Sequence, residues 1–262
     1  MNNQLHVYAL PTLVAAEELA GATVVVIDVL RASTTIIHAL NAGAAEIIPC
    51  GEVEQARALA ADFPREEVVL GGERGGLPID GFDLGNSPSE YTPDRVAGRT
   101  IVFTTTNGTR AMMRCRKAGR VLIGAFVNAS AVAEQLVGCE RISLLCAGTE
   151  GEYSRDDILM AGLLVDRLQR QSGILYELNA QAMTARENWT SSFAVPYVVG
   201  AEPFPPGLLV KELRRSAGGR NLVAVGLEED MQTAAQIDRF RVLPEMDPDT
   251  LHIRASESGP RE

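Results

Sequence analysis

Short apolar runs alternate along this chain with longer stretches in which apolar residues recur every three or four positions. The runs are rich in Val and Ile, which is typical of buried strands, whereas the second spacing predicts helices with one buried face. Strands are predicted over residues 23–27, 46–48, 67–70, 100–104, 120–123 and 141–145, and helices over 34–41, 53–62, 109–117, 129–137 and 156–171. This alternation predicts a parallel or mixed sheet covered by helices.

Three stretches lack this periodicity. Residues 77–92 are rich in Pro, Gly and acids, and an unstructured connection of this length is uncommon unless it is functional. Residues 188–207 are rich in Pro, Gly and aromatics and predict a linker or a lid, and the tail after Pro244 is expected to be loosely ordered. We therefore divide the chain into an α/β portion, 1–187, and a C-terminal portion, 188–262, that completes the fold. The recurring strand-then-polar-turn pattern suggests two related α/β halves.

Composition and charge narrow the classes of partner. The 262 residues are 46% hydrophobic and 22% charged, an ordinary globular balance. The net charge of −10 argues against a nucleic-acid partner, because phosphate backbones favour Lys and Arg, but a small anionic substrate responds only to the local field. Because the sequence shows neither a signal peptide nor an apolar run of about 20 residues, we expect a cytoplasmic protein with no membrane partner.

The junction after the first predicted strand carries the first candidate chemistry. Asp28 ends the apolar run 24–27 and would lie at the carboxyl end of a strand, where open α/β sheets bind ligands. Arg31, Ser33 and Thr34 follow at a helix N-terminus and suit a phosphate or sulfonate group. The alternatives are a turn or capping role for Asp28, a surface ion pair for Arg31, and simple helix capping by the two hydroxyls.

A glycine-rich turn, G-G-E-R-G-G over residues 71–76, follows another apolar run. Its glycines would let backbone amides approach a ligand closely, although it is neither a P-loop nor a dinucleotide-binding fingerprint. Glu73 is a candidate metal ligand and Arg74 a candidate anion ligand, and the alternative is a flexible turn. In the long loop that follows, we expect Asp83 to approach the site.

Two further junctions repeat this polar pattern. In T-T-T-N-G-T-R, residues 104–110, we expect Asn107, Gly108 and Thr109 to bind a phosphoryl group with help from the helix dipole. In C-A-G-T-E-G-E-Y-S-R-D-D, residues 146–157, Asp156 is a candidate for a hard-cation site, and a solvated acidic loop is an equal alternative. Mg²⁺ keeps several waters, so one or two carboxylates with a substrate phosphate suffice to bind it.

Other hydrolase classes fit the residues less well. A cysteine phosphatase places Cys and Arg six positions apart, whereas Cys50 and Arg57 are seven apart. A haloacid-dehalogenase-like phosphatase has Asp two positions after the first Asp, where this chain has Leu30. The three histidines disfavour a zinc or histidine phosphatase, and the absence of G-x-S-x-G disfavours an α/β-hydrolase.

Taken in order, the four junctions resemble the 2-phosphosulfolactate phosphatase family. The matching segments are V-V-I-D-V-L-R-A-S-T-T, G-G-E-R-G-G-L-P-I-D-G-F-D-L-G-N-S-P-S-E-Y, T-T-T-N-G-T-R-A and C-A-G-T-E-G-E-Y-S-R-D-D, with G-L-E-E-D-M from Gly226 also similar. The resemblance implies a three-layer α/β/α fold with two subdomains and Mg²⁺-dependent hydrolysis of 2-phosphosulfolactate to sulfolactate and phosphate, a step toward coenzyme M. Because the family extends beyond coenzyme M biosynthesis, a related phosphorylated 2-hydroxy acid is an open alternative.

These observations lead to one mechanistic hypothesis with stated rivals. Mg²⁺ would bridge the substrate phosphate and protein carboxylates. The residues we assign are Asp28, Glu73 and Asp156 to the metal, Asp28, Arg31 and Glu73 to catalysis, and Arg31, Ser33, Thr34, Arg74, Asn107, Gly108 and Thr109 to the substrate. Asp28 could instead attack phosphorus directly. The rivals are a non-catalytic module that binds an anionic metabolite and an interaction protein with structural cation sites, and a homo-oligomer is left open.

Overall fold

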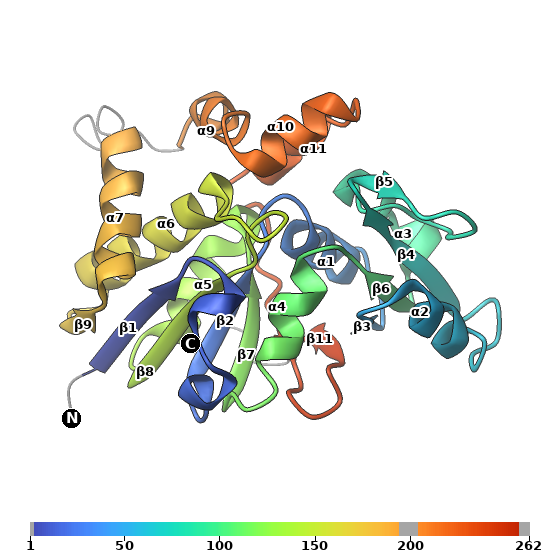
Figure 1. Ribbon diagram of the computed structural model, residues 1–262, viewed down its shortest axis with the longest axis horizontal. Coiled ribbons are helices and arrows are strands. Elements are labelled where there is room, and N and C mark those ends of the chain that lie inside the picture. Colours follow the sequence, from blue (N-terminus) through green and yellow to red (C-terminus); the bar gives the residue numbers. More distant parts are fainter. Residues whose placement is uncertain (1–2, 194–203, 257–262) are drawn as a thin grey trace.

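The computed structural model describes residues 3–193 and 204–256, which form a large mixed sheet with helices on both faces (Figure 1). In these residues the sheet has eleven strands in the order β5-β4-β6-β3-β11-β10-β7-β2-β8-β1-β9. The predicted fold class, a parallel or mixed sheet in a three-layer α/β/α arrangement, is confirmed.

The elements follow one another in a largely alternating order. The strands are β1 (Asn3–Tyr8), β2 (Thr23–Ile27), β3 (Glu46–Pro49), β4 (Val68–Arg74), β5 (Leu77–Pro78), β6 (Thr100–Thr104), β7 (Arg120–Gly124), β8 (Arg141–Cys146), β9 (Tyr176–Leu178), β10 (Pro244–Met246) and β11 (Ile253–Ala255). The helices are α1 (Ala32–Asn41), α2 (Val53–Ala60), α3 (Pro93–Val96), α4 (Gly108–Arg114), α5 (Ala129–Leu136), α6 (Arg155–Gln171), α7 (Ala180–Ser192), α9 (Pro206–Leu213), α10 (Ala217–Ala224) and α11 (Glu229–Ala234). Short 3₁₀ turns include η3 (Pro88–Glu90).

The sheet consists of two parallel groups joined by an antiparallel hairpin. Strands β4, β6 and β3 are parallel to one another, as are β7, β2, β8, β1 and β9. The hairpin β10–β11 lies between the groups, with Ile253 beside Ile47 of β3 and Met246 beside Val121 of β7. The expectation of a loosely ordered tail after Pro244 is therefore wrong for residues 245–256, because buried residues there complete the centre of the sheet, and 257–262 lie outside the described residues.

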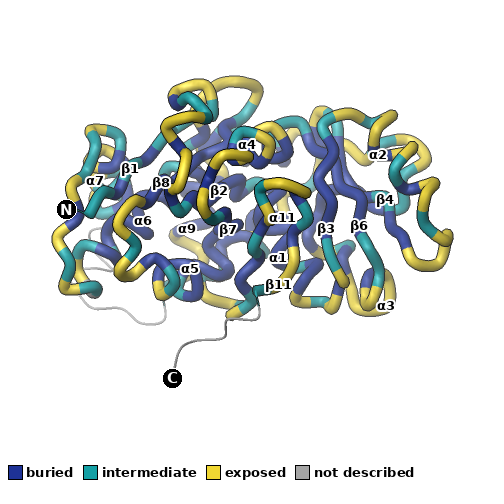
Figure 2. Tube along the Cα trace, turned by 90° about the horizontal axis from the view of Figure 1, so that it is seen from below, coloured by how far each residue is buried: buried dark blue, intermediate teal, exposed yellow. Residues whose placement is uncertain are grey.

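Two hydrophobic cores cover the two faces of the sheet. Val25 and Ile27 of β2 belong to the core that includes residues of α5, α6, α7 and α9, whereas Val24 and Val26 belong to the core formed with α1 and α4. Figure 2 shows the strands as buried, with exposed residues mainly in the connections. A strand buried on both faces needs a continuous apolar run, which is the pattern that the sequence shows there.

The predicted elements correspond to β2, β3, β4, β6, β7 and β8 and to helices α1, α2, α4, α5 and α6. Of the stretch 188–207, the first residues continue α7 and the last begin α9, so it is helical at both ends, and 194–203 lie outside the described residues. The boundary between 1–187 and 188–262 stays a prediction. Both portions supply strands to one sheet.

The C-terminal helices determine where a site can form. Figure 1 shows α9, α10 and α11 together at the end of the sheet where the parallel strands of the β2 group terminate. The junction after β2 and the start of α6 therefore lie beneath a helical cap, whereas residues 150–153 of the junction after β8 are exposed. In the part of the chain that the structure describes, none of the helices has the length and apolar character needed to span a bilayer.

Candidate active site

A cleft lies between the carboxyl ends of the strands and the helical cap. Its empty volume, including the open mouth, is about 480 Å³. Each of the four polar junctions contributes to its lining, through Asp28, Glu73, Asn107 and Glu150, and helix α10 contributes Asn221. The structure thus brings together the junctions that the sequence places far apart.

Asp28 is positioned by the transition from β2 to α1. Its Oδ1 accepts a hydrogen bond of 3.2 Å from the amide of Ala32, the first residue of α1, and its own amide donates to Ser33 Oγ at 3.0 Å. Among the described residues, no hydrogen-bond donor reaches Asp28 Oδ2. A Cβ added to Gly108 would lie 2.7 Å from Oδ2, so a glycine at this position lets the start of α4 approach the carboxylate.

The buried carboxylates at this end of the sheet repel one another. Burial, and next the neighbouring Asp156, raise the pKa of Asp28 to about 7, with a further contribution from Glu73. Burial also raises the pKa of Asp156, and burial together with the other two aspartates raises the pKa of Asp157 well above its usual range. A cation bound among them would favour the ionised forms and reverse these shifts.

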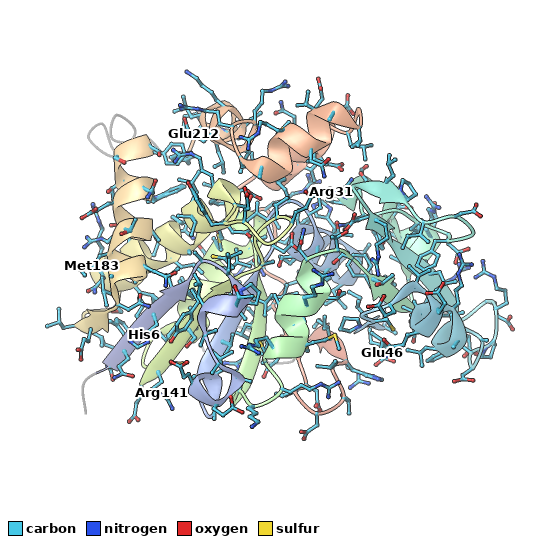
Figure 3. The ribbon with its side chains drawn as sticks, viewed as in Figure 1. His6, Arg31, Glu46, Arg141, Met183 and Glu212 are labelled. Atoms are coloured by element: carbon cyan, nitrogen blue, oxygen red, sulfur yellow. The ribbon has the colours of Figure 1, made fainter. Side chains whose placement is uncertain are left out.

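Arg31 lies beneath the helical cap (Figure 3) and is part of a buried ion pair. Its Nη1 donates to Asp230 Oδ2 of α11 at 2.9 Å, and its Nη2 donates to the carbonyl of Gly76 at 2.7 Å. The other oxygen of Asp230 accepts from Ser87 Oγ. The alternative interpretation of Arg31, a surface ion pair, is therefore wrong, because the pair is buried. Arg31 also lines the cleft.

Glu73 and Arg74 diverge although they are adjacent. The carboxylate of Glu73 lines the cleft and accepts from the amides of Gly76 and Thr106, each at 2.8 Å, and from Thr106 Oγ1 at 3.2 Å. Arg74 instead donates to the carbonyl of Gly51 and to Thr104 Oγ1. Glu73 therefore connects two loops of the cleft. Arg74 is not among the residues that line the cleft, and its assignment to the substrate stays a prediction.

The predicted hydroxyl ligands are engaged with the backbone. Thr34 Oγ1 donates to the carbonyl of Val29 at 2.7 Å, and Thr109 Oγ1 donates to that of Thr105 at 2.8 Å. Ser33 Oγ accepts from Asp28, as described above, and all three residues are buried. Asn107 lies on the cleft surface and accepts from the amide of Glu150 at 3.2 Å. These groups shape the loops, and the substrate roles of all four stay predictions.

Asp156 and Asp157 begin α6 and have different partners. Asp157 accepts from the amides of Val29 at 2.9 Å and Gly148 at 3.0 Å, which joins the ends of β2 and β8. Asp156 accepts from Ser154 Oγ and lies near the side chain of Ser216, at the N-terminus of α10. Asp156 therefore connects the cap to the strand ends.

Three residues that matter to the cleft were not assigned from the sequence: Asn86, Asn221 and Asp230. Asn86 is only 4% exposed and lines the cleft. Asp83, which we expected from the same loop, instead pairs with Arg65 and accepts from the amide of Leu70. The length of the loop 77–92 signalled a function, but which of its polar residues faces inward depends on how the loop folds.

The oxygen donors at the cleft suit Mg²⁺ only in part. Within residues 3–193 and 204–256, no three His, Cys, Asp or Glu side chains form a ready-made metal site. Asp28 has an open oxygen, whereas the oxygens of Glu73 and Asp156 accept hydrogen bonds from neutral donors. A hard cation that uses one carboxylate, water and substrate oxygens fits these residues, and a cage made only of protein ligands does not.

Comparison with known proteins gives matches to one family. A family model described as 2-phosphosulpholactate phosphatase matches residues 8–249. A probable 2-phosphosulfolactate phosphatase of Symbiobacterium thermophilum is 40% identical over 230 residues, which cover 87% of this chain and 93% of the relative. A protein with the same name from Deinococcus radiodurans is 40% identical over 227 residues, which cover 85% of this chain and 87% of the relative. Another, from Synechococcus sp. RCC307, is 39% identical over 243 residues, which cover 90% of this chain and 94% of the relative.

Proposed function

This chain belongs to the 2-phosphosulfolactate phosphatase family, and from that premise we propose that it is a Mg²⁺-dependent phosphatase. Its substrate would be 2-phosphosulfolactate or a related phosphorylated 2-hydroxy acid, and the products would be the hydroxy acid and phosphate. With 2-phosphosulfolactate the reaction would serve coenzyme M biosynthesis. The observation that supports this most directly is Asp28, a buried carboxylate with an open oxygen in the cleft and a pKa raised to about 7.

A group that titrates near neutral pH suits proton transfer. In the ligand-free protein the pKa of Asp28 is about 7, so the carboxyl can hold a proton under physiological conditions, and Mg²⁺ would displace that proton and leave Asp28 ionised. The amide of Ala32 keeps Oδ1 fixed, so the proton is exchanged at Oδ2. Attack by Asp28 on phosphorus remains a rival role for the same oxygen.

Positive charge and side-chain amides in the cleft suit an anionic substrate. Arg31 is held in the cleft by Asp230 and Gly76, so its guanidinium does not need to be ordered when an anion binds. Mg²⁺, bound by Asp28 with Glu73 and Asp156 as the further predicted ligands, would offset negative charge on the phosphoryl oxygens. Asn107 and Asn221 offer amide groups to the remaining acidic groups of the substrate.

The test is phosphate release from 2-phosphosulfolactate, 2-phospholactate and phosphoglycolate, each with Mg²⁺ and with EDTA. We expect release that requires Mg²⁺, and the ranking of substrates shows whether the sulfonate is recognised. Tight binding of these compounds without release in either condition would refute the proposal and favour a metabolite-binding module.

A further inference from the structure

The hydroxyl of Ser87 contacts the helical cap and not the turn that the residue begins. Ser87 lies at the N-cap of η3, where a serine side chain usually accepts a hydrogen bond from a backbone amide, but here it accepts none from that turn. Its Oγ instead donates to Asp230 Oδ1 on helix α11, and the residue is only 7% exposed. The hydroxyl therefore connects the long loop 77–92 to the cap.

This contact is part of a chain of hydrogen bonds that ends at Arg31. A serine hydroxyl has one hydrogen, and a carboxylate paired with a guanidinium only accepts. Because Ser87 gives its hydrogen to Asp230, the exposed Ser89 is the donor in the 3.0 Å contact between the two serine Oγ atoms. Asp230 Oδ2 in turn accepts from Arg31 Nη1 at 2.9 Å. The start of α1, the loop 77–92 and α11 thus meet at one carboxylate.

The backbone next to Ser87 is held by a separate contact. Thr35 Oγ1 of α1 donates to the carbonyl of Asn86, the preceding residue, at 2.9 Å. This hydrogen bond does not involve the Ser87 side chain, so it persists when that hydroxyl is removed. Replacing Ser87 by Ala should therefore change the contact with Asp230 and leave the loop in place.

Arg31 is oriented by acceptors on two of its three nitrogens. Nη1 donates to Asp230 and Nη2 donates to the carbonyl of Gly76 at 2.7 Å, which together fix the plane of the guanidinium. Nε has no acceptor among the described residues, where the buried side-chain atoms without a partner are His38 Nε2 and Asn86 Oδ1. Because Nε is not one of these buried atoms, its N–H is open to the cleft that Arg31 lines.

The orientation of this one side chain controls how an anion is held. In the part of the chain that the structure describes, Arg31 is the only Lys or Arg that lines the cleft. We propose that Ser87 is a positioning residue that, through Asp230, orients Arg31 toward the phosphate group of the substrate. Without the hydroxyl, Asp230 Oδ1 has no donor from the loop, so the carboxylate and the paired guanidinium can turn together. This inference rests on the phosphatase function proposed above.

The test uses inorganic phosphate as the probe, so that binding is measured without turnover. In Ser87→Ala we expect the Kd of phosphate, measured by calorimetry on the full chain with Mg²⁺, to rise about tenfold, because a displaced guanidinium binds an anion less well. KM for the best substrate should rise by a similar factor and kcat should change less, since Arg31 holds the phosphate before and during the reaction. Ser87→Thr keeps a hydroxyl and should restore both quantities.

Ser130→Ala is the matched control. Ser130 Oγ donates to Asp238 Oδ2 at 2.8 Å, and Arg167 pairs with the same carboxylate at 2.8 Å. These three residues repeat the serine, carboxylate and arginine arrangement, but none of them lines the cleft. The substitution removes the same kind of hydrogen bond, so it should lower the urea midpoint about as much as Ser87→Ala and leave the Kd of phosphate and KM unchanged. The two variants separate lost stability from lost orientation of Arg31.

Three outcomes would overturn the inference. A Kd of phosphate in Ser87→Ala equal to that of the wild type would show that Arg31 keeps its orientation without the hydroxyl. An equal rise of Kd in Ser130→Ala would show that the effect comes from stability alone. Weak phosphate binding in a Ser87→Thr variant that is as stable as the wild type would show that the hydroxyl is not the cause. Failure of the phosphatase function is seen separately, in a wild-type protein that binds phosphate and releases none from any of the esters.

Discussion

The cleft contains two kinds of buried carboxylate, which differ in how their charge is balanced. Asp230 pairs with Arg31, and Glu73 accepts three hydrogen bonds from neighbouring loops. Asp28 instead has an open oxygen, and burial, followed by repulsion from Asp156, raises its pKa to about 7. The first kind holds loops together within the protein. The second kind is balanced only when a proton or a cation is bound, as expected where function outweighs stability.

The largest effect should come from removing the unbalanced acid. Asp28→Asn abolishes proton transfer and the open carboxylate oxygen, so we expect phosphate release to fall by at least about 10³-fold. The ligand-free protein should be as stable as the wild type or more so, because repulsion with Asp156 is removed. Phosphate release and thermal unfolding measure the two effects. A variant that keeps most of its activity would contradict our assignment of Asp28.

Removing the charge of Asp230, which is paired with Arg31, should instead destabilise the fold. Asp230→Asn leaves the buried Arg31 without its carboxylate, which should lower the free energy of unfolding by about 3–5 kcal/mol. Replacing both partners, as Arg31→Met with Asp230→Leu, should restore part of that stability but not activity. Urea unfolding followed by circular dichroism measures the difference. Equal stability of Asp230→Asn and wild type would show that the ion pair does not hold the cap.

The pH dependence of the free energy of unfolding distinguishes Asp28 from the carboxylates that are already paired or hydrogen-bonded. In EDTA, the folded chain keeps a proton on Asp28 up to about pH 7, whereas an unfolded carboxyl loses it near pH 3.8. The folded state therefore binds more protons in this window, and stability should fall as pH rises through it. The raised pKa values of Asp156 and Asp157 act with the same sign.

The measurement is the urea midpoint at pH 5 and pH 7.5, for the wild type and for Asp28→Asn. We expect a shallower pH dependence in the variant, and Mg²⁺ should recover stability of the wild type at pH 7.5 if Asp28 binds the ion. Identical pH dependences in the two proteins would show that Asp28 does not titrate in this range.

The smallest effect should come from His38, at the other end of α1. Burial, and next Arg239, lower the pKa of His38 from 6.5 to about 4. The folded state resists protonation, so this group's contribution is complete above about pH 6.5 and lost as pH falls toward 4. At pH 5 the loss should be about 2 kcal/mol relative to His38→Leu, with activity unchanged in the variant. Urea unfolding at pH 7 and pH 5 tests this, and an equal response of both proteins would contradict it.

The C-terminal portion shows where sequence patterns fail. Strands β10 and β11 have three residues each, too short to show an alternating pattern, and they bury Met246 and Ile253 only because the two parallel groups leave a gap between them. Helices α10 and α11 are also short, at eight and six residues, and their place over the cleft depends on contacts such as that between Asp230 and Arg31, which are 199 positions apart. Local pattern carries no information about such contacts.

The residues of the cleft also differ in how far the sequence predicts them. The sequence by itself determined the junctions after the strands, because a continuous apolar run followed by a polar helix start is a local signal. Four residues of these junctions line the cleft: Asp28, Arg31, Glu73 and Asn107. Only the tertiary structure decided that Arg74 turns away, that Asp230 holds Arg31, and that Asn86, and not Asp83, lines the cleft. A residue type shows which chemistry a side chain can perform, whereas its partners, its burial and its charge depend on segments that meet only when the chain folds.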